Sequence, residues 1–408
     1  MDSKENENTG GSSCLKSAFI HTLISTILIG AIAALLMLAL PNWGLLDPVS
    51  RSFDSFSFTD LYYSLYRNSD NAKPNDRIVI IDTSHKTRGE IASTIDELMT
   101  YEPATVGIDI IFDRPTGDTL GTQQLRNTVA RHSNNLVAIT KLLNYNDATQ
   151  QFESTSQSIL DKELTQRAYS NLKSIGEGGY VRNYTLWRNV AGDTLGSFAS
   201  VLASRYRVLF GGSAIAPELV DGIIDFMPQK FRMINADSLH LYADEIMGRI
   251  VLLGNVSNEE DVHYTPMGKM NGTIIHAYTI DTLLDRPTHT VSSGWILALE
   301  ALLLWGFVLV YWLISIACQR RDYKLLMAVV NWIYPVATAL LVVCLSGWLF
   351  ISSHRYVSPI LLMAAMAMLP NTVELYMTLK ESFIKNLAWL DSRIKTLIEK
   401  IKTHCYEK

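Results

Sequence analysis

The sequence predicts an α/β extracytoplasmic domain with a mainly parallel sheet and flanking helices, together with four transmembrane helices. Four apolar runs predict the membrane part: one extends from Ala18 to Leu40, and three more lie between Trp295 and Met377. Each run has the roughly 20 apolar residues that a helix needs to cross a bilayer. In the polar stretch between the first run and the others, compact apolar strands alternate with helical patterns. That alternation is typical of a parallel sheet covered by helices on both faces.

The polar stretch predicts its elements through two kinds of hydrophobic spacing. Continuous β-branched runs such as Ile78 to Ile81 predict buried strands, whereas the spacing of Ile91, Ile95 and Leu98 predicts a helix. Strands are predicted at residues 77–82, 105–112, 135–140, 180–187, 222–227 and 249–254. Helices are predicted at residues 59–66, 87–101, 123–132, 197–209 and, after an initial loop, within 271–284. Residues 142–157 are polar and are predicted to form a loop.

The basic residues that flank the apolar runs predict the orientation of the chain. Lys4 and Lys16 precede the first run, and Arg320, Arg321 and Lys324 lie between the second and the third. Seven more follow the fourth run: Lys380, Lys385, Arg393, Lys395, Lys400, Lys402 and Lys408. Cytoplasmic loops carry an excess of Lys and Arg. Both termini are therefore expected in the cytoplasm, with the polar stretch outside it.

These patterns divide the chain into successive segments of a multi-pass protein of the cytoplasmic membrane. The first run is too long, and its end too poor a cleavage site, for a removable signal peptide, so we expect an uncleaved anchor. The segments are a cytoplasmic N-terminus (1–17), an anchor (18–40), an extracytoplasmic domain (41–293), three further spans (294–317, 325–350 and 357–378), a cytoplasmic loop (318–324), an extracytoplasmic loop (351–356) and a cytoplasmic tail (379–408).

Composition excludes several classes of function. The external stretch has no cysteine, and at about 250 residues it is long enough to bury a stable core without disulfides. A net charge of -5 with both signs interspersed argues against binding nucleic acid. No metal-ligand spacing, phosphate-binding glycine loop or catalytic triad motif appears, so we expect no cofactor, no metal and no enzymatic activity. Too few spans, without repeated halves, argue against a transporter.

Several motifs together resemble a known sensory family. They are Arg77-Ile-Val-Ile-Ile-Asp82-Thr-Ser84, Val106-Gly-Ile-Asp109-Ile-Ile-Phe112, Arg249-Ile-Val-Leu-Leu-Gly254, Asp261, Thr265-Pro266-Met-Gly268 and Asn271-Gly272-Thr-Ile-Ile-His276-Ala277. The stretch from Trp43 to Met377 resembles the CHASE domain of the second type, an extracytoplasmic sensory module of bacterial signalling receptors. One helix before the domain and three spans after it are also typical of that family.

Two departures from the family pattern stand out. His85-Lys-Thr-Arg-Gly89 replaces the Trp-Pro-x-x-Arg segment that is common after the first strand. The chain also ends soon after its last span, where such receptors continue into a kinase, cyclase or diguanylate-type output domain. The resemblance therefore implies a sensor that signals to a separate cytoplasmic output protein.

Four residues are candidates for binding an external ligand. Asp82 and Asp109 end or interrupt apolar strands, and the loop from Asp261 to Gly268 follows another strand. If the sheet is parallel, all three lie at its carboxyl edge, where open α/β folds bind ligands. We expect a charged or polyhydroxyl ligand there, and Asp82→Asn and Asp109→Asn are expected to weaken its stabilising effect. The alternative is that these carboxylates cap helices or bond turn amides.

His276 is the fourth candidate, since it opens a predicted helix after Asn271-Gly272. It would act as a ligand or pH-sensing residue if Asp261 or His263 lay nearby. The alternative is a buried histidine that is bonded to the backbone.

The tail carries a heptad pattern. Apolar residues recur at alternating spacings of four and three: Phe383, Leu387, Leu390, Ile394, Leu397 and Ile401. One hypothesis is a parallel coiled coil that makes the protein a homodimer. The alternative is an amphipathic helix on the inner leaflet of the membrane.

The leading hypothesis is a membrane-anchored sensor. Its expected partners are the lipid membrane, an unknown small-molecule or protein ligand outside the cell, and an unknown cytoplasmic output protein. The second hypothesis is a non-signalling scaffold that assembles envelope components.

Overall fold

The computed structural model describes residues 19–35, 58–65, 72–113, 117–175, 180–257, 259–285, 288–290, 294–353, 355–357 and 359–406. The chain forms two compact units. One comprises residues Arg51–Val291 and Leu349–Tyr356, and we refer to it as the α/β unit. The other comprises Met1–Ser50, Ser292–Trp348 and Val357–Lys408, and we refer to it as the helical unit.

A six-stranded parallel sheet organises the α/β unit. Its strands lie in the order β12 (Gln229–Asn235), β1 (Lys73–Asp82), β13 (Ile250–Gly254), β2 (Thr105–Asp109), β3 (Leu136–Thr140) and β6 (Arg167–Tyr169). Every neighbouring pair is parallel. The predicted mainly parallel sheet is therefore confirmed, and β12 and β6 add edge strands that the hydrophobic pattern does not predict.

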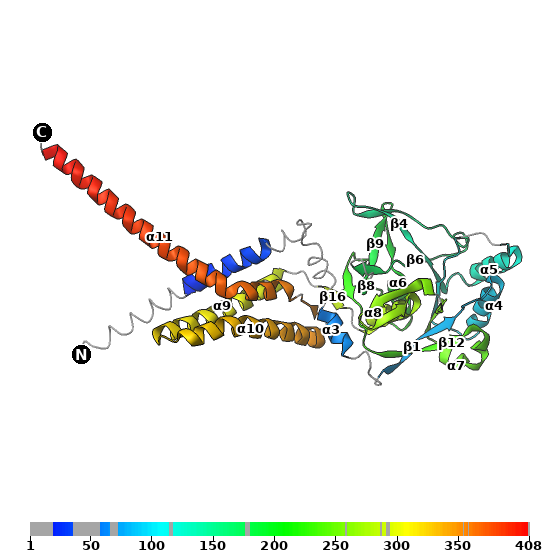
Figure 1. Ribbon diagram of the computed structural model, residues 1–408. Helices are drawn as coiled ribbons and strands as arrows, with labels where there is room; N and C mark the ends of the chain where they lie inside the picture. Colours follow the sequence, from blue (N-terminus) through cyan, green and yellow to red (C-terminus); the bar gives the residue numbers. More distant parts are fainter. Residues whose placement is uncertain are drawn as a thin grey trace. The chain divides into compact units, whose positions relative to one another are not determined.

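Helices cover both faces of this sheet (Figure 1). Helices α4 (Arg88–Met99) and α5 (Thr119–His132) pack on one face, and α6 (Phe198–Leu209) and α8 (Gly272–Asp285) on the other. Side chains alternate along each strand, so that Val79 and Ile81 face α4 and α5 while Ile78 and Ile80 face α6 and α8. A continuous β-branched run suits such a strand because both of its faces are buried.

Local sequence signals set where these helices begin and how closely they approach the sheet. Thr87 and Glu90 form a reciprocal capping box at the start of α4, and Ser197 caps α6. In β2, Gly107 has no side chain where a Cβ would meet Phe198 and Leu202 of α6. The absence of a Cβ lets α6 pack directly against the strand.

Two further sheets complete the α/β unit. The first joins β10 (Asp193–Gly196), β9 (Trp187–Val190), β5 (Gln151–Thr155) and β4 (Leu142–Asn146). The second contains β15 (Gly268–Asn271), β14 (Val262–Thr265), β8 (Tyr180–Thr185), β11 (Asp221–Ile223), β16 (Thr288–Thr290) and β17 (Arg355–Tyr356), with β7 (Lys173–Ile175) paired to β8. Short helices lie at Phe58–Ser64 (α3), Ala236–Leu241 (η3), Ala243–Ile246 (α7) and Glu259–Asp261 (η4).

The prediction of a loop at residues 142–157 is wrong. β4 and β5 form an antiparallel hairpin there, with Leu142 opposite Thr155 and Tyr145 opposite Phe152. Most of its side chains are exposed or only partly buried, so the strands are held by backbone pairing and leave no hydrophobic run in the sequence.

Among the described residues of the helical unit, three helices are long and apolar enough to cross a membrane: α9 (Gly294–Arg320), α10 (Lys324–Ser353) and α11 (Ile360–Tyr406). The first apolar run forms a shorter helix, Phe19–Leu35, and residues 36–40 of that run lie outside the described residues. Its Ile29 shares a buried cluster with Val308 of α9 and Met366 of α11. Three candidate spans are thus established, and the fourth stays a prediction.

Candidate ligand-binding site

The carboxyl edge of the parallel sheet borders a cavity of about 630 Å³, a volume within the range of small-molecule sites. Its walls come from the ends of β2 and β3, the segments after β6 and β13, and the start of α8. The lining residues are Asp109, Ile110, Ile111, Ile139, Lys141, Ser170, Asn171, Leu172, Asn255, Asp261, His263, Gly272, Thr273 and His276. We refer to this space as the carboxyl-edge cavity.

Asp109 is the buried acid of the carboxyl-edge cavity. Its side chain is 7% exposed, and its Oδ2 accepts a 2.7 Å hydrogen bond from the hydroxyl of Thr273. The Nε2 of His276, whose side chain is 9% exposed, lies 4.0 Å from Asp109 Oδ1. Burial raises the pKa of the Asp109 carboxyl, and His276 and Thr273 oppose that rise only in part.

Asp261 and His263 form the more open wall of the same cavity. The His263 Nε2 and the Asp261 Oδ1 are 3.2 Å apart, and the two side chains are 32% and 45% exposed. Two glycines permit this arrangement: a Cβ on Gly272 would collide with Asp261, and a Cβ on Gly254 would collide with Thr273. The Asn271-Gly272 pair thus brings the loop carboxylate against the start of α8.

Asp82 lies on the same edge of the sheet but does not line this cavity. β13 separates its strand from that of Asp109, since Gly254 pairs with both residues. The Asp82 carboxylate accepts hydrogen bonds from the Ser84 amide at 3.0 Å and the Val256 amide at 3.3 Å. These are the turn-amide contacts of the alternative interpretation. The Ser84 hydroxyl lies 2.6 Å from Asn255 Oδ1, so Asp82 reaches the cavity wall only through Ser84.

His276 is buried, as the alternative interpretation expects, and its ring nitrogen lies near the carboxylate of Asp109. It lines the cavity next to Asp109, and its ring also packs edge-on against Phe198 at a centroid distance of 5.3 Å. Three of the four candidate residues, Asp109, Asp261 and His276, thus line the same cavity.

The sequence reasoning missed several lining residues. Lys141 directly follows a predicted strand, so the carboxyl-edge rule that selected Asp109 also applies to it. Asn171 follows β6, a strand with no hydrophobic signature, and its amide bonds both the N–H and the C=O of Leu142.

The chemistry of the carboxyl-edge cavity suits a polar ligand. Carboxylates, imidazoles, an amide and a lysine offer both acceptors and donors. In the part of the chain that the structure describes, no group of three or more His, Cys, Asp or Glu residues is arranged to hold a metal ion.

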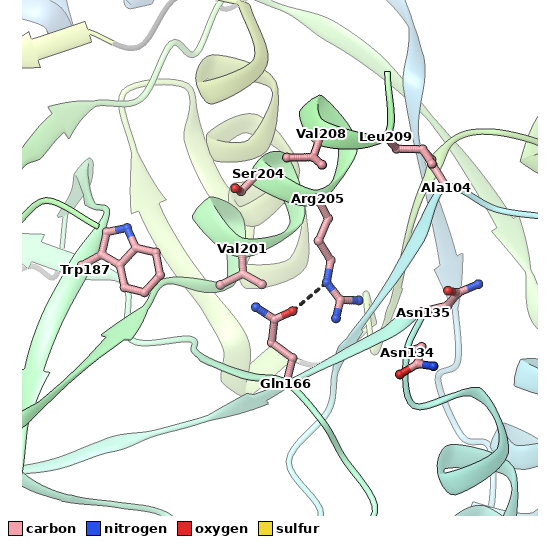
Figure 2. A pocket seen from close by; sticks show the side chains of 10 residues that line it. All are labelled: Ala104, Asn134, Asn135, Gln166, Trp187, Val201, Ser204, Arg205, Val208 and Leu209. Atoms are coloured by element: carbon pink, nitrogen blue, oxygen red, sulfur yellow. Dashed lines mark hydrogen bonds between the residues drawn. The ribbon is translucent and has the colours of Figure 1, made fainter. Parts of the chain in front are cut away.

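A second cavity lies at the opposite, amino edge of the sheet (Figure 2). Ala104, just before β2, and Asn135, just before β3, belong to its walls.

The predicted contact residues of the tail all lie on one helix. α11 runs without interruption from the last candidate span through Phe383, Leu387, Leu390, Ile394, Leu397 and Ile401. The first four side chains are 50–66% exposed. Exposed apolar side chains at this spacing are compatible with both a coiled coil and an interfacial helix.

Comparison with known proteins identifies the class of this chain. The family model of the CHASE2 domain matches residues 29–313, most of the chain. The protein therefore belongs to the CHASE2 domain family, whose members are extracellular sensory domains, as the motifs in the sequence indicated. No curated protein and no solved structure matches the chain. Together with the three apolar helices, the family shows a membrane protein with an extracellular sensory domain.

Proposed function

We propose that this protein is a sensor of the cytoplasmic membrane that binds a small polar ligand in the carboxyl-edge cavity and passes its state to helices α10 and α11. The signal then reaches a separate cytoplasmic protein through the tail. The observation that carries the proposal concerns one helix, α8, which borders the ligand cavity at its start. Further along, its Tyr278 is connected through Phe226 and Tyr63 to Phe350, in the segment that joins α10 to α11.

α8 begins at the cavity and is buried along most of its length. Thr273 bonds Asp109, and His276 lies one turn further along. Beyond them, the Thr282 hydroxyl accepts a 2.9 Å hydrogen bond from the amide of Asp225. A change of charge or occupancy at Asp109 therefore acts directly on a helix that is held firmly at both ends.

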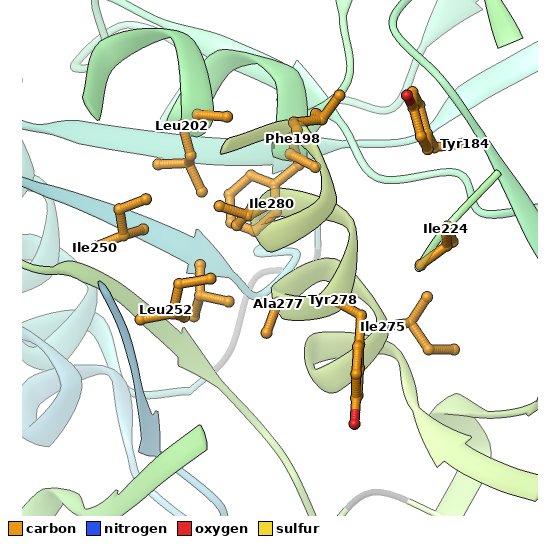
Figure 3. Close-up of a cluster of buried hydrophobic side chains, with 14 of the residues drawn as sticks. Tyr184, Phe198, Leu202, Ile224, Ile250, Leu252, Ile275, Ala277, Tyr278 and Ile280 are labelled. Carbon is orange, nitrogen blue, oxygen red and sulfur yellow. The ribbon is translucent and has the colours of Figure 1, made fainter. Parts of the chain in front are cut away.

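A chain of aromatic rings begins at Tyr278 of α8, which Figure 3 shows among the buried side chains. Tyr278 packs on Phe226 at 5.5 Å between ring centroids, Phe226 on Tyr63 at 6.0 Å, and Tyr63 on Phe350 at 6.3 Å. Tyr62 also contacts Phe350, at 5.7 Å. Tyr63, Phe226, Tyr278 and Phe350 belong to the same buried cluster as residues of the sheet, α6 and α8. We refer to these four residues and Tyr62 as the aromatic chain.

Phe350 belongs to the segment Leu349–Tyr356, which ends α10 and precedes α11. This segment is part of the α/β unit, and it includes residues 351–356, for which an extracytoplasmic loop is predicted. Its strand β17 pairs in parallel with β16, His289 opposite Arg355 and Thr290 opposite Tyr356. A rearrangement of the aromatic chain is thus expected to move the ends of two candidate spans.

α3 is fixed to the same region from the N-terminal side. Arg182, only 5% exposed, makes a bidentate ion pair with Asp60 of α3 at 2.6 and 2.7 Å. The Tyr63 hydroxyl bonds the Ile224 carbonyl at 3.3 Å. Bidentate arginine–carboxylate pairs are strong and directional. The segment after the first apolar helix and the segment between α10 and α11 therefore share one anchoring region.

The cytoplasmic end of the proposed route is the tail. Because α11 continues from the last candidate span into the heptad residues, a shift or rotation of the span would reach Phe383 to Ile401 without a hinge. We propose that these residues pair two copies of the chain and form the contact for the output protein.

The coupling is tested by hydrogen exchange on the full chain in lipid nanodiscs. Asp109→Asn removes the ionisable carboxyl at nearly constant volume, and Asp96→Asn is the control on α4, on the opposite face of the sheet. Asp109→Asn is expected to change exchange rates in residues 349–357 by roughly fivefold or more, the range of ordinary allosteric coupling. Equal exchange in the wild type and in Asp109→Asn, or the same change in both variants, would refute the proposed route.

The output step is tested by affinity capture from native membranes with the full chain and with a chain that lacks Lys380 to Lys408. The sensor proposal expects that cytoplasmic partners are lost with the tail. Capture that is unchanged by the truncation, through envelope proteins bound to the external domain, favours the scaffold hypothesis instead.

A further inference from the structure

The cavity at the amino edge of the sheet has a different character from the carboxyl-edge cavity. Its volume is about 390 Å³, within the range of small-molecule sites. The lining residues are Ala104, Asn134, Asn135, Gln166, Trp187, Val201, Ser204, Arg205, Val208 and Leu209. Among these residues the only charged side chain is that of Arg205, and we refer to this space as the Arg205 cavity.

Arg205 has no acidic partner among the described residues. Its Nε donates to Gln166 Oε1 at 2.7 Å and one terminal nitrogen donates to the Leu136 carbonyl at 3.4 Å, both uncharged acceptors. Other arginines of the α/β unit do form ion pairs with carboxylates: Arg77, Arg126, Arg131, Arg167, Arg182, Arg188 and Arg232. Arg205 is thus a cation that faces a cavity without a counter-charge.

An anion would complete this arrangement. Burial lowers the pKa of the Arg205 guanidinium, because a half-buried cation loses hydration. A guanidinium has five N–H donors in a planar fork, and the two hydrogen bonds described leave donors for a ligand. Figure 2 shows the guanidinium between Gln166 and the two asparagines, Asn134 and Asn135. A carboxylate fits such a fork with two parallel hydrogen bonds.

The Arg205 cavity also has apolar walls beside its polar ones. Trp187, Val201, Val208 and Leu209 line it. The indole Nε1 of Trp187 is buried and has no acceptor among the described residues. A ligand that fills the space therefore needs an apolar body as well as one negative charge.

We propose that the Arg205 cavity binds a small organic carboxylate with an apolar or aromatic body. Arg205 binds the carboxylate, and Trp187, Val201 and Val208 pack against the body. The site lies at the opposite edge of the sheet from the carboxyl-edge cavity, so the proposal does not depend on the sensor mechanism described above.

The test uses benzoate as the probe, with the full chain in detergent and isothermal titration calorimetry at pH 7. Benzamide, nearly the same shape without the charge, is expected to bind about tenfold more weakly or worse. Inorganic phosphate, which has the charge without the apolar body, is expected to bind similarly weakly. No binding of benzoate, or equal binding of all three compounds, would overturn the proposal.

Three variants locate the site. Arg205→Met removes the charge and is expected to weaken benzoate binding about tenfold or more. Arg207→Met, a change of the same charge on the same helix outside the cavity, is the matched control and is expected to bind as the wild type does. Val208→Trp keeps Arg205 and fills the cavity from an exposed position, so it decides the question if Arg205→Met fails to fold. Wild-type benzoate affinity in either Arg205→Met or Val208→Trp would show that benzoate binds elsewhere.

Discussion

The two faces of the parallel sheet are buried to a similar degree but built from different chemistry. The face under α4 and α5 is aliphatic: Ile95, Leu98, Leu125 and Val129 pack on the strands with almost no access to solvent. Phe112 is the one aromatic residue among the buried members of that cluster. Aliphatic packing of this kind stabilises a fold without directing any group toward a partner.

The face under α6 and α8 combines packing with rings and buried polar groups. It contains the aromatic chain, and α8 also places Asp281 at 4% exposure beside Asn75, Arg77 and Gln229. Directional contacts of this kind hold one arrangement more narrowly than aliphatic packing does. Both faces therefore stabilise the fold, but only the α6–α8 face also has the directional contacts that fix the geometry of the site and of the segment that joins α10 to α11.

The largest expected effect is on the polar network of the α6–α8 face. Asp281→Ala leaves Arg77, Asn75 and Gln229 without their common acceptor. Loss of one partner in such a buried network costs about 4 kcal/mol of unfolding free energy. Asp285→Ala is the matched control, because it removes the other carboxylate that pairs with Arg77. The Asp285 side chain is 60% exposed, so its loss should cost less than about 1 kcal/mol. Chemical denaturation of the full chain measures both, and equal losses would contradict the importance of the network.

The opposite face is tested by Leu98→Ala, which empties a fully buried position in α4. The expected loss is about 3 kcal/mol, from lost burial and from the cavity left behind. Leu120→Ala in α5, where the side chain is 79% exposed, should change the free energy by less than about 0.5 kcal/mol. Hydrogen exchange in residues 349–357 should stay as in the wild type for both variants, and an altered exchange pattern would break the distinction between the faces.

A smaller effect is expected at the start of α4. Thr87→Ala removes the capping box, in which Thr87 and Glu90 satisfy each other's backbone amides. The expected loss is about 1 kcal/mol of unfolding free energy. Thr87→Ser keeps the hydroxyl acceptor and should restore most of it. If serine and alanine destabilise equally, packing of the Thr87 methyl group matters more than the cap.

The most subtle effect is a pH dependence that belongs to the α6–α8 face. The pKa of Asp109 is raised in the folded state above its ordinary value of 3.8, so the folded protein holds this proton more tightly than the unfolded chain does. The contribution of Asp109 to stability therefore falls as pH rises from about its unfolded value through its folded pKa. Asp109→Asn should remove that fall, so the difference in unfolding free energy between the variant and the wild type should change with pH over this range. A difference that stays constant with pH would show that the Asp109 carboxyl is not the group responsible.

Much of the central fold could be predicted because its strands are buried on both faces. Runs such as Ile78 to Ile81 and Ile250 to Leu253 leave an unbroken apolar signal. β12, which reads Gln-Lys-Phe-Arg-Met-Ile-Asn, is an edge strand with mostly exposed or half-buried side chains, and its pairing rests on backbone groups that sequence does not distinguish. The same reason accounts for the β4–β5 hairpin.

The site was only partly predictable, because sequence does not give the order of strands in a sheet. Asp82 and Asp109 lie on consecutive predicted strands. In the sheet, however, β13, which is more than a hundred residues further along the chain, lies between those two strands. That insertion puts the 261–268 loop and His276 beside Asp109 and leaves Asp82 outside the cavity. Arg205 had no signal of its own, since its cavity arises from how α6 packs at the amino edge.

The placement of Phe350 has a consequence for biosynthesis. A ribosome makes Tyr62 and Tyr63 early, but the ring that covers them and the strand that pairs with β16 emerge only after α9 and nearly all of α10. At about 5–20 residues per second, translation from β16 to Phe350 takes several seconds. The aromatic surface of Tyr62 and Tyr63 lacks Phe350 during that time. Completion of the sensory domain thus depends on translation through the second candidate span, and a fragment that ends before it lacks a piece of its own core.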